Sequence, residues 1–447
     1  MVGREEQLAA LNEHYAAPGK SNLTIVYGRS GIGKTALVRE FIKDKEYLYF
    51  EAFPRAAFEM LDAMNRAFGS NDRLSYEDLF DRIINEHFTA ERKLVIIENF
   101  QNIIKGDPDF MAKLADILGV HSDLMIVLTC SSVAWIENSM VGTIGNAALA
   151  INSFIKLKPL SYTDVVSMLP SGSTNIDNLT FYAITGGIPA YMKRWNVKAS
   201  IRANVCNEIL NVNGRLYDVA HEFLQEEFRE TAIYNTLLGC LASGMDKLND
   251  IHDYTGYGRD KISVYLGNLI EREIVEKVFS YDKENSESAR KGCYRICDPI
   301  VNYWYRFVYP NKSVMGSMST ADFYDRYISG NVNEYLLSTF VKIGQEFMEI
   351  LKTIGQLDST YEYKGGYYGK DGDVHIIMVN ADGKAVIGQC HVKNKPYDSF
   401  EHALLKENIR IAGLEAVRVY VFSLSGFAED IKDMASDELL LMPIEEL

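Results

Sequence analysis

A short glycine-rich segment near the N-terminus has the residue types and spacing of a loop that holds phosphate groups. Residues 28–35 read Gly-Arg-Ser-Gly-Ile-Gly-Lys-Thr, which satisfies the pattern G-x-x-x-x-G-K-S/T. The glycines let the backbone curl so that successive N–H groups point at phosphate oxygens. In such a loop Lys34 would reach the β- and γ-phosphates of a nucleotide, and the Thr35 hydroxyl would bind Mg2+. The predicted nucleotide contacts are Gly28, Arg29, Ser30, Gly31, Ile32, Gly33, Lys34, Thr35 and Ala36.

A second candidate for the same chemistry is an acidic residue at the end of an apolar run. Residues 94–97 read Leu-Val-Ile-Ile and are followed by Glu98, as in a buried parallel strand that ends beside the loop. Because Mg2+ prefers oxygen ligands, we expect Glu98 to bind the metal ion together with Thr35. The next residue, Asn99, stands where a second carboxylate would polarise the attacking water. We therefore expect binding to survive better than hydrolysis; that Glu98 merely ends a strand is the alternative.

Three segments are expected to position these residues. Residues 22–27 are β-branched and aromatic, and residues 36–42 have apolar side chains at helical spacing, so the loop joins a strand to a helix. A third buried strand, residues 124–129, runs into Cys130-Ser131-Ser132. Polar residues at the carboxyl ends of parallel strands face the ligand crevice, so Ser131 or Thr129 could contact the γ-phosphate. We include Ser131 with Lys34 and Glu98 as catalytic candidates, although a serine here could equally cap the next helix.

Together with other motifs, these segments resemble the archaeal-type ATPases, P-loop proteins close to the AAA+ and STAND groups. The C-terminal part of that family is related to the PD-(D/E)XK nucleases. The resemblance extends along nearly the whole chain and rests on motifs in a fixed order. Besides the three segments above, these are Val2-Gly3-Arg4-Glu5, Leu157-Lys158-Pro159-Leu160-Ser161, Gly186-Gly187-Ile188-Pro189, Tyr294-Arg295-Ile296-Cys297-Asp298-Pro299, Trp304-Tyr305-Arg306-Phe307-Val308, Phe422-Ser423 and Ser425-Gly426-Phe427.

The resemblance implies further features of the nucleotide site. Val2, Gly3 and Arg4 would lie against the adenine, and the turn at 186–189 would open a helix that closes a lid over the nucleotide. The family commonly carries an arginine in a loop after the Ser-Ser strand. The corresponding residues 142–147 contain no arginine, which favours weak or partner-dependent turnover.

The resemblance also implies the domain organisation of an α/β protein. A P-loop NTPase core with a parallel sheet would occupy residues 1–155, and a helical lid would occupy residues 156–224. A winged helix would follow in residues 225–312, and an α+β nuclease-like domain in residues 313–447.

The segment expected to form the winged helix could bind DNA or could have a solvated surface. Its residues read as helix, helix, turn, helix and hairpin, the second strand being residues 292–296 after a polar tip. Arg259, Lys261 and Asn268 on the second helix of the helix-turn-helix could read DNA bases. From residue 228 to 312, however, 12 basic residues balance 12 acidic ones, so a solvated face is an equal alternative for these side chains.

The nuclease-like segment has lost the residues that cleave nucleic acid in active members of that superfamily. His375 replaces the metal-binding Asp, Gln389 the Glu, and His391 the Lys. A glutamine supplies no charge to Mg2+, so we expect no nuclease activity and a structural or binding role. The alternative is a transition-metal site made by Asp373, His375 and His391. The remaining carboxylates, Glu346 and Glu349, are as readily explained as a solvated helix edge.

Composition limits the other possibilities. The 447 residues are 47% apolar and carry a net charge of -15, which disfavours a surface that binds nucleic acid throughout. The six cysteines form no CxxC pair, so neither a zinc site nor a disulfide framework is indicated. Charged residues stand where a signal peptide needs an apolar stretch, and no run of about 18 apolar residues occurs. We expect a cytoplasmic protein without a membrane segment.

These observations favour an ATP-binding regulatory switch that uses ATP and Mg2+ and hydrolyses the nucleotide slowly. The nucleotide would set the relative position of the winged helix and the C-terminal domain, with a possible protein partner. The alternative is a DNA-binding protein in which the nucleotide is structural and the nuclease domain inactive.

Overall fold

The computed structural model describes residues 1–447 except 18, 229, 282–291, 371 and 447. It divides the chain into two compact units. The first comprises residues 1–160 and 188–190, and the second comprises residues 161–187 and 191–447. The predicted division of the second unit into lid, winged helix and C-terminal domain stays a prediction.

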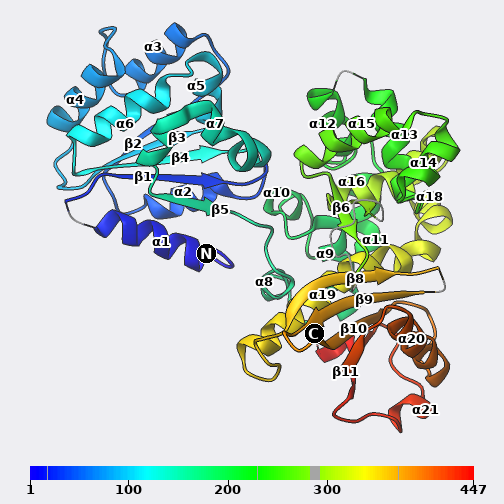
Figure 1. Cartoon of the computed structure of the whole chain (residues 1–447). Helices are drawn as coiled ribbons and strands as arrows, with labels where there is room; N and C mark the ends of the chain where they lie inside the picture. Colours follow the sequence, from blue (N-terminus) through cyan, green and yellow to red (C-terminus); the bar gives the residue numbers. More distant parts are fainter. Residues whose placement is uncertain (18, 229, 282–291, 371, 447) are drawn as a thin grey trace. The chain divides into compact units, whose positions relative to one another are not determined.

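The first unit is built on a five-stranded parallel sheet with strand order β2-β3-β4-β1-β5. Helices cover both faces of this sheet, with α3 to α6 on one side and α1 and α2 on the other (Figure 1). The strands are β1 Asn22–Tyr27, β2 Leu48–Glu51, β3 Lys93–Glu98, β4 Leu124–Cys130 and β5 Ser153–Lys156. The helices are α1 Glu5–Ala16, α2 Lys34–Phe41, α3 Ala57–Ala67, α4 Tyr76–Glu86, α5 Gln101–Gly106, α6 Phe110–Val120 and α7 Met140–Ile144.

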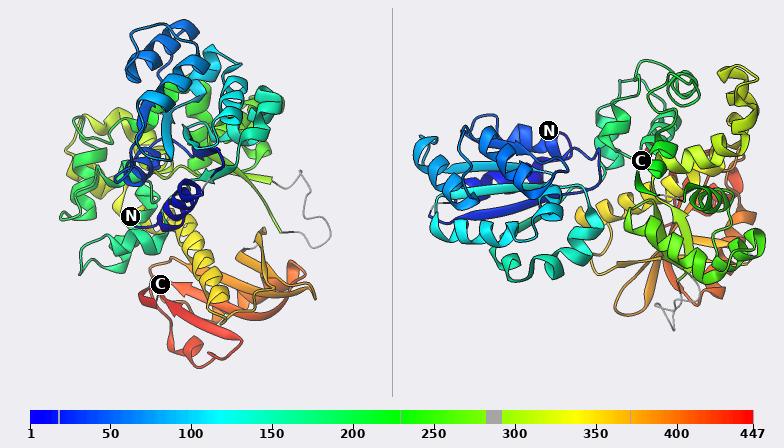
Figure 2. Two further views of the ribbon diagram at one scale, coloured as in Figure 1. Left: turned by 90° about the vertical axis from the view of Figure 1, so that its left-hand side faces the viewer. Right: turned by 90° about the horizontal axis from the view of Figure 1, so that it is seen from above.

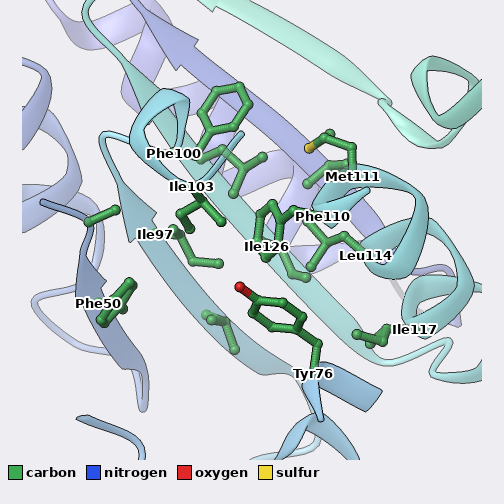
Figure 3. Packing of buried hydrophobic residues seen from close by; sticks show 14 of the residues in the cluster. Phe50, Tyr76, Ile97, Phe100, Ile103, Phe110, Met111, Leu114, Ile117 and Ile126 are labelled. Carbon is green, nitrogen blue, oxygen red and sulfur yellow. The ribbon is translucent and has the colours of Figure 1, made fainter. Parts of the chain in front are cut away.

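Burial on both faces explains why the strand sequences are apolar runs rather than alternating patterns. Every residue of β4 is buried. On the side covered by α4 and α6, Ile97 and Ile126 of the sheet face Tyr76, Phe110 and Leu114 of the helices (Figure 3). This packing fixes the carboxyl ends of β3 and β4, where the predicted site residues lie.

The second unit begins with helices and ends with a sheet. Helices α9, α16 and α19 pack together in it, and α13, α14 and α15 precede the two-stranded antiparallel hairpin β6–β7. The helices are α8 Tyr162–Ser167, α9 Asn175–Thr185, α11 Ile201–Asn204, α12 Val219–Glu227, α13 Thr231–Ala242, α14 Leu248–Thr255, α15 Arg259–Glu271, α16 Pro299–Tyr303, α17 Lys312–Met315, α18 Thr320–Tyr327 and α19 Val332–Thr353. The helix α10, Pro189–Met192, starts in the first unit and ends in the second.

The hairpin strands are β6 Val275–Phe279 and β7 Gly292–Ile296, and β7 has the bounds predicted for the second strand. The predicted polar tip between them lies mostly outside the described residues.

The last sheet is mixed, with strand order β12-β11-β10-β9-β8. Strand β9 is antiparallel to both of its neighbours, β8 and β10. Strands β10, β11 and β12 are parallel to one another. The long helix α19 lies against this sheet (Figure 2), and α20 packs on it as well. The elements are β8 Glu362–Tyr368, β9 Asp373–Val379, β10 Lys384–His391, α20 Ser399–Ile411, β11 Glu415–Ser423, α21 Glu429–Lys432 and β12 Leu439–Pro443. The predicted α/β fold class is confirmed by the parallel sheet with its helices and by this second sheet.

Candidate nucleotide-binding site

The predicted phosphate-binding loop joins the carboxyl end of β1 to the first turn of α2. The backbone N–H of Gly28 donates to the carbonyl of Cys130 at 3.2 Å, which ties the start of the loop to the end of β4. Gly31 has a φ of 77°, in the left-handed region that favours glycine. The loop therefore has the curled backbone that the sequence predicted.

Lys34 is almost fully buried at the centre of this loop. Its ammonium group donates to the carbonyl of Gly28 at 2.7 Å and to that of Arg29 at 3.0 Å. Burial lowers the pKa of Lys34 to about 8, and the nearby Glu98 partly opposes this change. The structure thus places a buried ammonium group within the loop, where phosphate oxygens could replace backbone carbonyls as its acceptors.

Thr35 and Glu98, the two predicted metal ligands, are in direct contact. The Thr35 hydroxyl donates to Oε2 of Glu98 at 2.9 Å. Glu98 is only 3% exposed, and its other oxygen, Oε1, has no hydrogen-bond partner among the described residues. A buried carboxylate oxygen without a donor is costly, and a hydrated divalent cation would satisfy it. The residues present therefore fit Mg2+.

Asn99 and Ser131 lie beside this pair at the ends of β3 and β4. Asn99 has a φ of 56°, and its backbone N–H donates to the Thr129 hydroxyl at 3.1 Å. The Ser131 hydroxyl donates to Oδ1 of Asn99 at 3.4 Å. Ser131 is thus tied to the end of β3, and its expected contact with the γ-phosphate stays a prediction.

Arg4 holds the loop from the N-terminal side, which the sequence did not indicate. Its buried guanidinium group donates through Nη2 to the carbonyls of Ile32 at 3.2 Å and Lys158 at 2.7 Å. The same group also donates through Nη1 to the carbonyl of Gly3. Arg4 therefore contacts protein backbone, and the expected adenine contact of Val2, Gly3 and Arg4 stays a prediction.

The residues after the Gly-Gly turn also contact the loop. The backbone N–H of Ala190 donates to the carbonyl of Gly31 at 3.1 Å. Ile188 is buried, and the Pro189 ring lies 3.8 Å from the position that a Cβ on Gly33 would take. Residues 188–190 are therefore packed directly against the loop.

The side chains expected to read DNA bases make contacts within their own module. Nε of Arg259 donates to Oδ1 of Asn249 at 2.9 Å, and Nδ2 of Asn268 donates to the Tyr234 hydroxyl at 2.8 Å. The ammonium group of Lys261 lies over an aromatic ring of the same module, 5.1 Å from its centre. Arg259 and Lys261 remain exposed, so these contacts weaken the base-reading hypothesis without excluding a backbone contact.

The C-terminal sheet does not assemble the alternative transition-metal site. Nδ1 of His375 accepts a hydrogen bond from the backbone N–H of Cys390 at 3.0 Å. His391 lies 2.8 Å from Oε2 of Glu401 through Nδ1 and 2.6 Å from the carbonyl of Lys395 through Nε2. In the described part of the chain, no group of three His, Cys, Asp or Glu side chains could hold a metal ion. The proposed set of Asp373, His375 and His391 is therefore wrong, because Nδ1 of His375 and both ring nitrogens of His391 already have protein partners.

Glu346 does not fit the solvated helix edge that was one of its two interpretations. It is half-buried on α19, where Oε2 accepts from the backbone N–H of Tyr162 at 3.2 Å. Burial raises the pKa of this carboxyl group. Glu349, by contrast, pairs with Lys352 at 2.9 Å on the same helix.

None of the helices in the described residues is both long enough and apolar enough to cross a bilayer.

A phosphate-binding loop between a parallel strand and a helix, with an acidic strand end beside it, defines a P-loop nucleotide-binding domain. The family model described as AAA ATPase domain matches residues 1–127, which lie within the first unit. A second model, described as Archaea bacterial proteins of unknown function (DUF234), matches residues 304–404. This pair of domains confirms the resemblance to archaeal-type ATPases.

The similar proteins include one curated sequence and several solved structures. The chain is 25% identical over 397 residues, 86% of each chain, to the uncharacterized protein MJECL04 of Methanocaldococcus jannaschii. It resembles the Walker-type ATPase PABY2304 of Pyrococcus abyssi with a TM-score of 0.48 and 17% identity, over 68% of this chain and 96% of that one. For the Aeropyrum pernix ORC2 protein the TM-score is 0.44 and the identity 16%, over 71% of this chain and 95% of that one.

Proposed function

We propose that this protein is an ATP-binding regulatory switch that hydrolyses the nucleotide slowly. The observation that carries the proposal is the contact between Thr35 and Glu98, which pairs the loop hydroxyl with a buried carboxylate. In the part of the chain that the structure describes, the second carboxylate oxygen of Glu98 has no hydrogen-bond partner, and the ammonium group of Lys34 lies in the loop. A triphosphate with Mg2+ would supply both the cation and the phosphate oxygens that this arrangement lacks.

Each predicted residue then has one task. Backbone N–H groups of residues 28–36 and the ammonium group of Lys34 would hold the phosphates. Thr35 and Glu98 would hold the metal ion, which neutralises phosphate charge when bound. Ser131, through its hydrogen bond to Asn99, would sense the γ-phosphate.

The residues that usually accelerate hydrolysis are weak or missing. The Asn99 side chain cannot act as a base. Residues 142–147, which begin within α7, contain no arginine. We therefore expect the protein to act through its nucleotide-bound and nucleotide-free states more than through fast turnover.

The switch itself would use residues 188–190. They contact the loop through the Ala190–Gly31 hydrogen bond, and the chain on either side of them belongs to the second unit. A change in the loop on binding phosphate would therefore act directly on the backbone that leads into that unit in both directions.

A second candidate function is DNA binding by a winged helix, with the nucleotide in a structural role. The order α13, α14, α15 and hairpin β6–β7 favours it. The intramolecular contacts of Arg259 and Asn268 speak against it. In both cases we propose that the C-terminal sheet is an inactive nuclease-like domain.

A nucleotide titration followed by thermal unfolding, run beside a steady-state phosphate-release assay, tests the proposal. We expect ATP with Mg2+ to raise the melting temperature and the release rate to be low. A fast release rate would make the protein an enzyme rather than a switch. The absence of any ATP-dependent rise would refute nucleotide binding altogether.

A further inference from the structure

The hairpin β6–β7 is attached to the C-terminal sheet at its far end. Ser280, directly after β6, forms a parallel bridge with Gly366 of β8. The backbone N–H of Tyr281 donates to the Gly366 carbonyl at 2.7 Å, and that of Tyr368 donates to the Ser280 hydroxyl at 2.9 Å. Because β8 is an outermost strand of its sheet, the chain leaving β6 extends the sheet at that edge.

The other hairpin strand reaches the same part of β8 through a side chain. Nη1 of Arg295, on β7, donates to the Tyr368 hydroxyl at 3.2 Å. The guanidinium group also lies over the Tyr368 ring, 4.3 Å from its centre. A stacked and hydrogen-bonded arginine is held in one orientation, so both strands of the hairpin are fixed to β8.

Strand β8 is shaped for this approach. A Cβ on Gly366 would lie 2.8 Å from the His375 carbonyl and 2.9 Å from the Val374 carbonyl, closer than atoms can pack. The register of β8 against β9 shifts on both sides of Gly365, as at a bulge. Only glycine fits at position 366, where the hairpin makes its backbone contact.

The same arginine brings a positive charge next to the altered nuclease-like residues. Tyr368, which Arg295 contacts, is the register partner of Asp373 on β9. Burial raises the pKa of Asp373, and the charge of Arg295 opposes that change. Burial, helped by the charge of Arg295, lowers the pKa of His375 to about 4. The hairpin thus supplies a cation beside the one acidic residue that remains on β9.

From these contacts we infer that the β6–β7 hairpin is an internal docking arm rather than a nucleic-acid contact. Its strands join the helices α13 to α15 to the C-terminal sheet, and Arg295 is engaged in that junction. The helices and the sheet are therefore joined through the described strands of the hairpin, and Arg295 on β7 is not available for a DNA contact. This inference does not depend on nucleotide binding.

Hydrogen exchange measured by mass spectrometry on the full chain tests the junction. We expect Ser280→Ala combined with Arg295→Ala to speed exchange of the amides of residues 280–281 and 366–368 about tenfold or more, equivalent to about 1.4 kcal/mol. Exchange in β10 and β11 should not change. Arg259→Ala removes the same charge from α15 and is the matched control, with no expected effect on β8. Unchanged exchange at 366–368 in the double variant would overturn the inference.

Duplex-DNA binding at low salt, followed by fluorescence anisotropy, provides the second measurement. Wild type and Arg295→Ala should bind equally or not at all, because Arg295 is not available to phosphates. A fall in affinity of about tenfold in Arg295→Ala would show a direct DNA contact and overturn the inference. If the alanine variants fail to fold, Tyr368→Phe, which removes only the accepting hydroxyl, should still speed exchange at 366–368. No effect of Tyr368→Phe would then count against the junction.

Discussion

The backbone N–H of Ala190 donates a hydrogen bond of 3.1 Å to the carbonyl of Gly31, which joins the phosphate-binding loop to the start of α10. The approach is so close that a Cβ on Gly31 would lie 2.6 Å from the Ala190 Cβ. The loop and residues 188–190 are therefore packed against each other without spare room, and a single methyl group should disturb the contact.

Gly31→Ala should destabilise the first unit by about 1–3 kcal/mol more than Gly19→Ala, measured by urea unfolding. Both glycines have a positive φ, 77° at Gly31 and 66° at Gly19, so both variants carry backbone strain. Gly19, however, has nothing within 4 Å of its Cβ position. Equal losses in the two variants would mean that the Ala190 contact contributes nothing.

Lys34→Ala should abolish the ATP-dependent rise in melting temperature, because it removes the buried ammonium group of the loop. Lys43→Ala is the control: Lys43 is exposed and pairs with Glu40 at 3.1 Å. Equal stabilisation of wild type and Lys34→Ala by ATP would contradict the assignment of the site.

The pH dependence of ATP binding should follow Lys34. Burial lowers its pKa to about 8, so above that pH the nucleotide-free protein loses the charge that phosphates need. Affinity should therefore fall as the pH rises through about 8, and binding just above that pH should take up a proton. The stability of the nucleotide-free protein should change with pH in the opposite direction to its affinity for ATP. Between about pH 8 and the ordinary pKa of lysine, only the unfolded chain holds this proton, so the free energy of unfolding rises with pH. Calorimetry in two buffers of different ionisation enthalpy measures the uptake. A constant affinity from about pH 7 to about pH 9 would exclude this role.

Turnover by the isolated protein should be slower than about 1 per second, because the Asn99 side chain cannot accept a proton from water. Asn99→Asp should raise the rate more than Asn99→Glu does. The φ of 56° at this position suits Asn and Asp, whereas Glu would be strained by about 1 kcal/mol or more. A phosphate-release assay on the three proteins decides this, and a wild-type rate above that limit would show that another group activates the water.

The C-terminal domain should not nick plasmid DNA with Mg2+ or Mn2+. Both imidazole nitrogens of His391 face acceptors within the domain, and Gln389 supplies no charge. Restoring activity should require His375→Asp, Gln389→Glu and His391→Lys together with Arg295→Ala, because the guanidinium charge beside Asp373 repels a cation. Robust cleavage by wild type that is lost in His391→Ala would show that the histidines carry out the chemistry.

The sequence predicts the centre of the site because its determinants are local. The glycine pattern around Lys34 and the apolar run ending in Glu98 each lie within one short segment, and parallel strands bring their ends to one edge. The buried strands were predictable for the same reason, since burial on both faces leaves a continuous apolar run.

Contacts between distant segments were not predictable. Arg4 and Lys158 are 154 residues apart, and nothing in either segment indicates the other. A solvated helix edge was one of the two interpretations of Glu346, because the periodicity of a helix does not reveal the Tyr162 N–H that donates to it. The histidines of the C-terminal sheet have side chains that could bind a metal ion. Nδ1 of His391, however, already contacts the carboxylate of Glu401 on the following helix, α20.

The guanidinium of Arg4 links the beginning of the chain to residues made much later, with a consequence for synthesis. When residues 28–35 leave the ribosome, neither Lys158 nor Ala190 has yet been made, although both contribute contacts to the loop region. By the time Ala190 appears, α9 of the second unit has already been translated. The nucleotide-binding unit can therefore be completed only after the first helices of the following unit have been made. Until then, the phosphate-binding loop of the nascent chain lacks the contacts from Lys158 and Ala190.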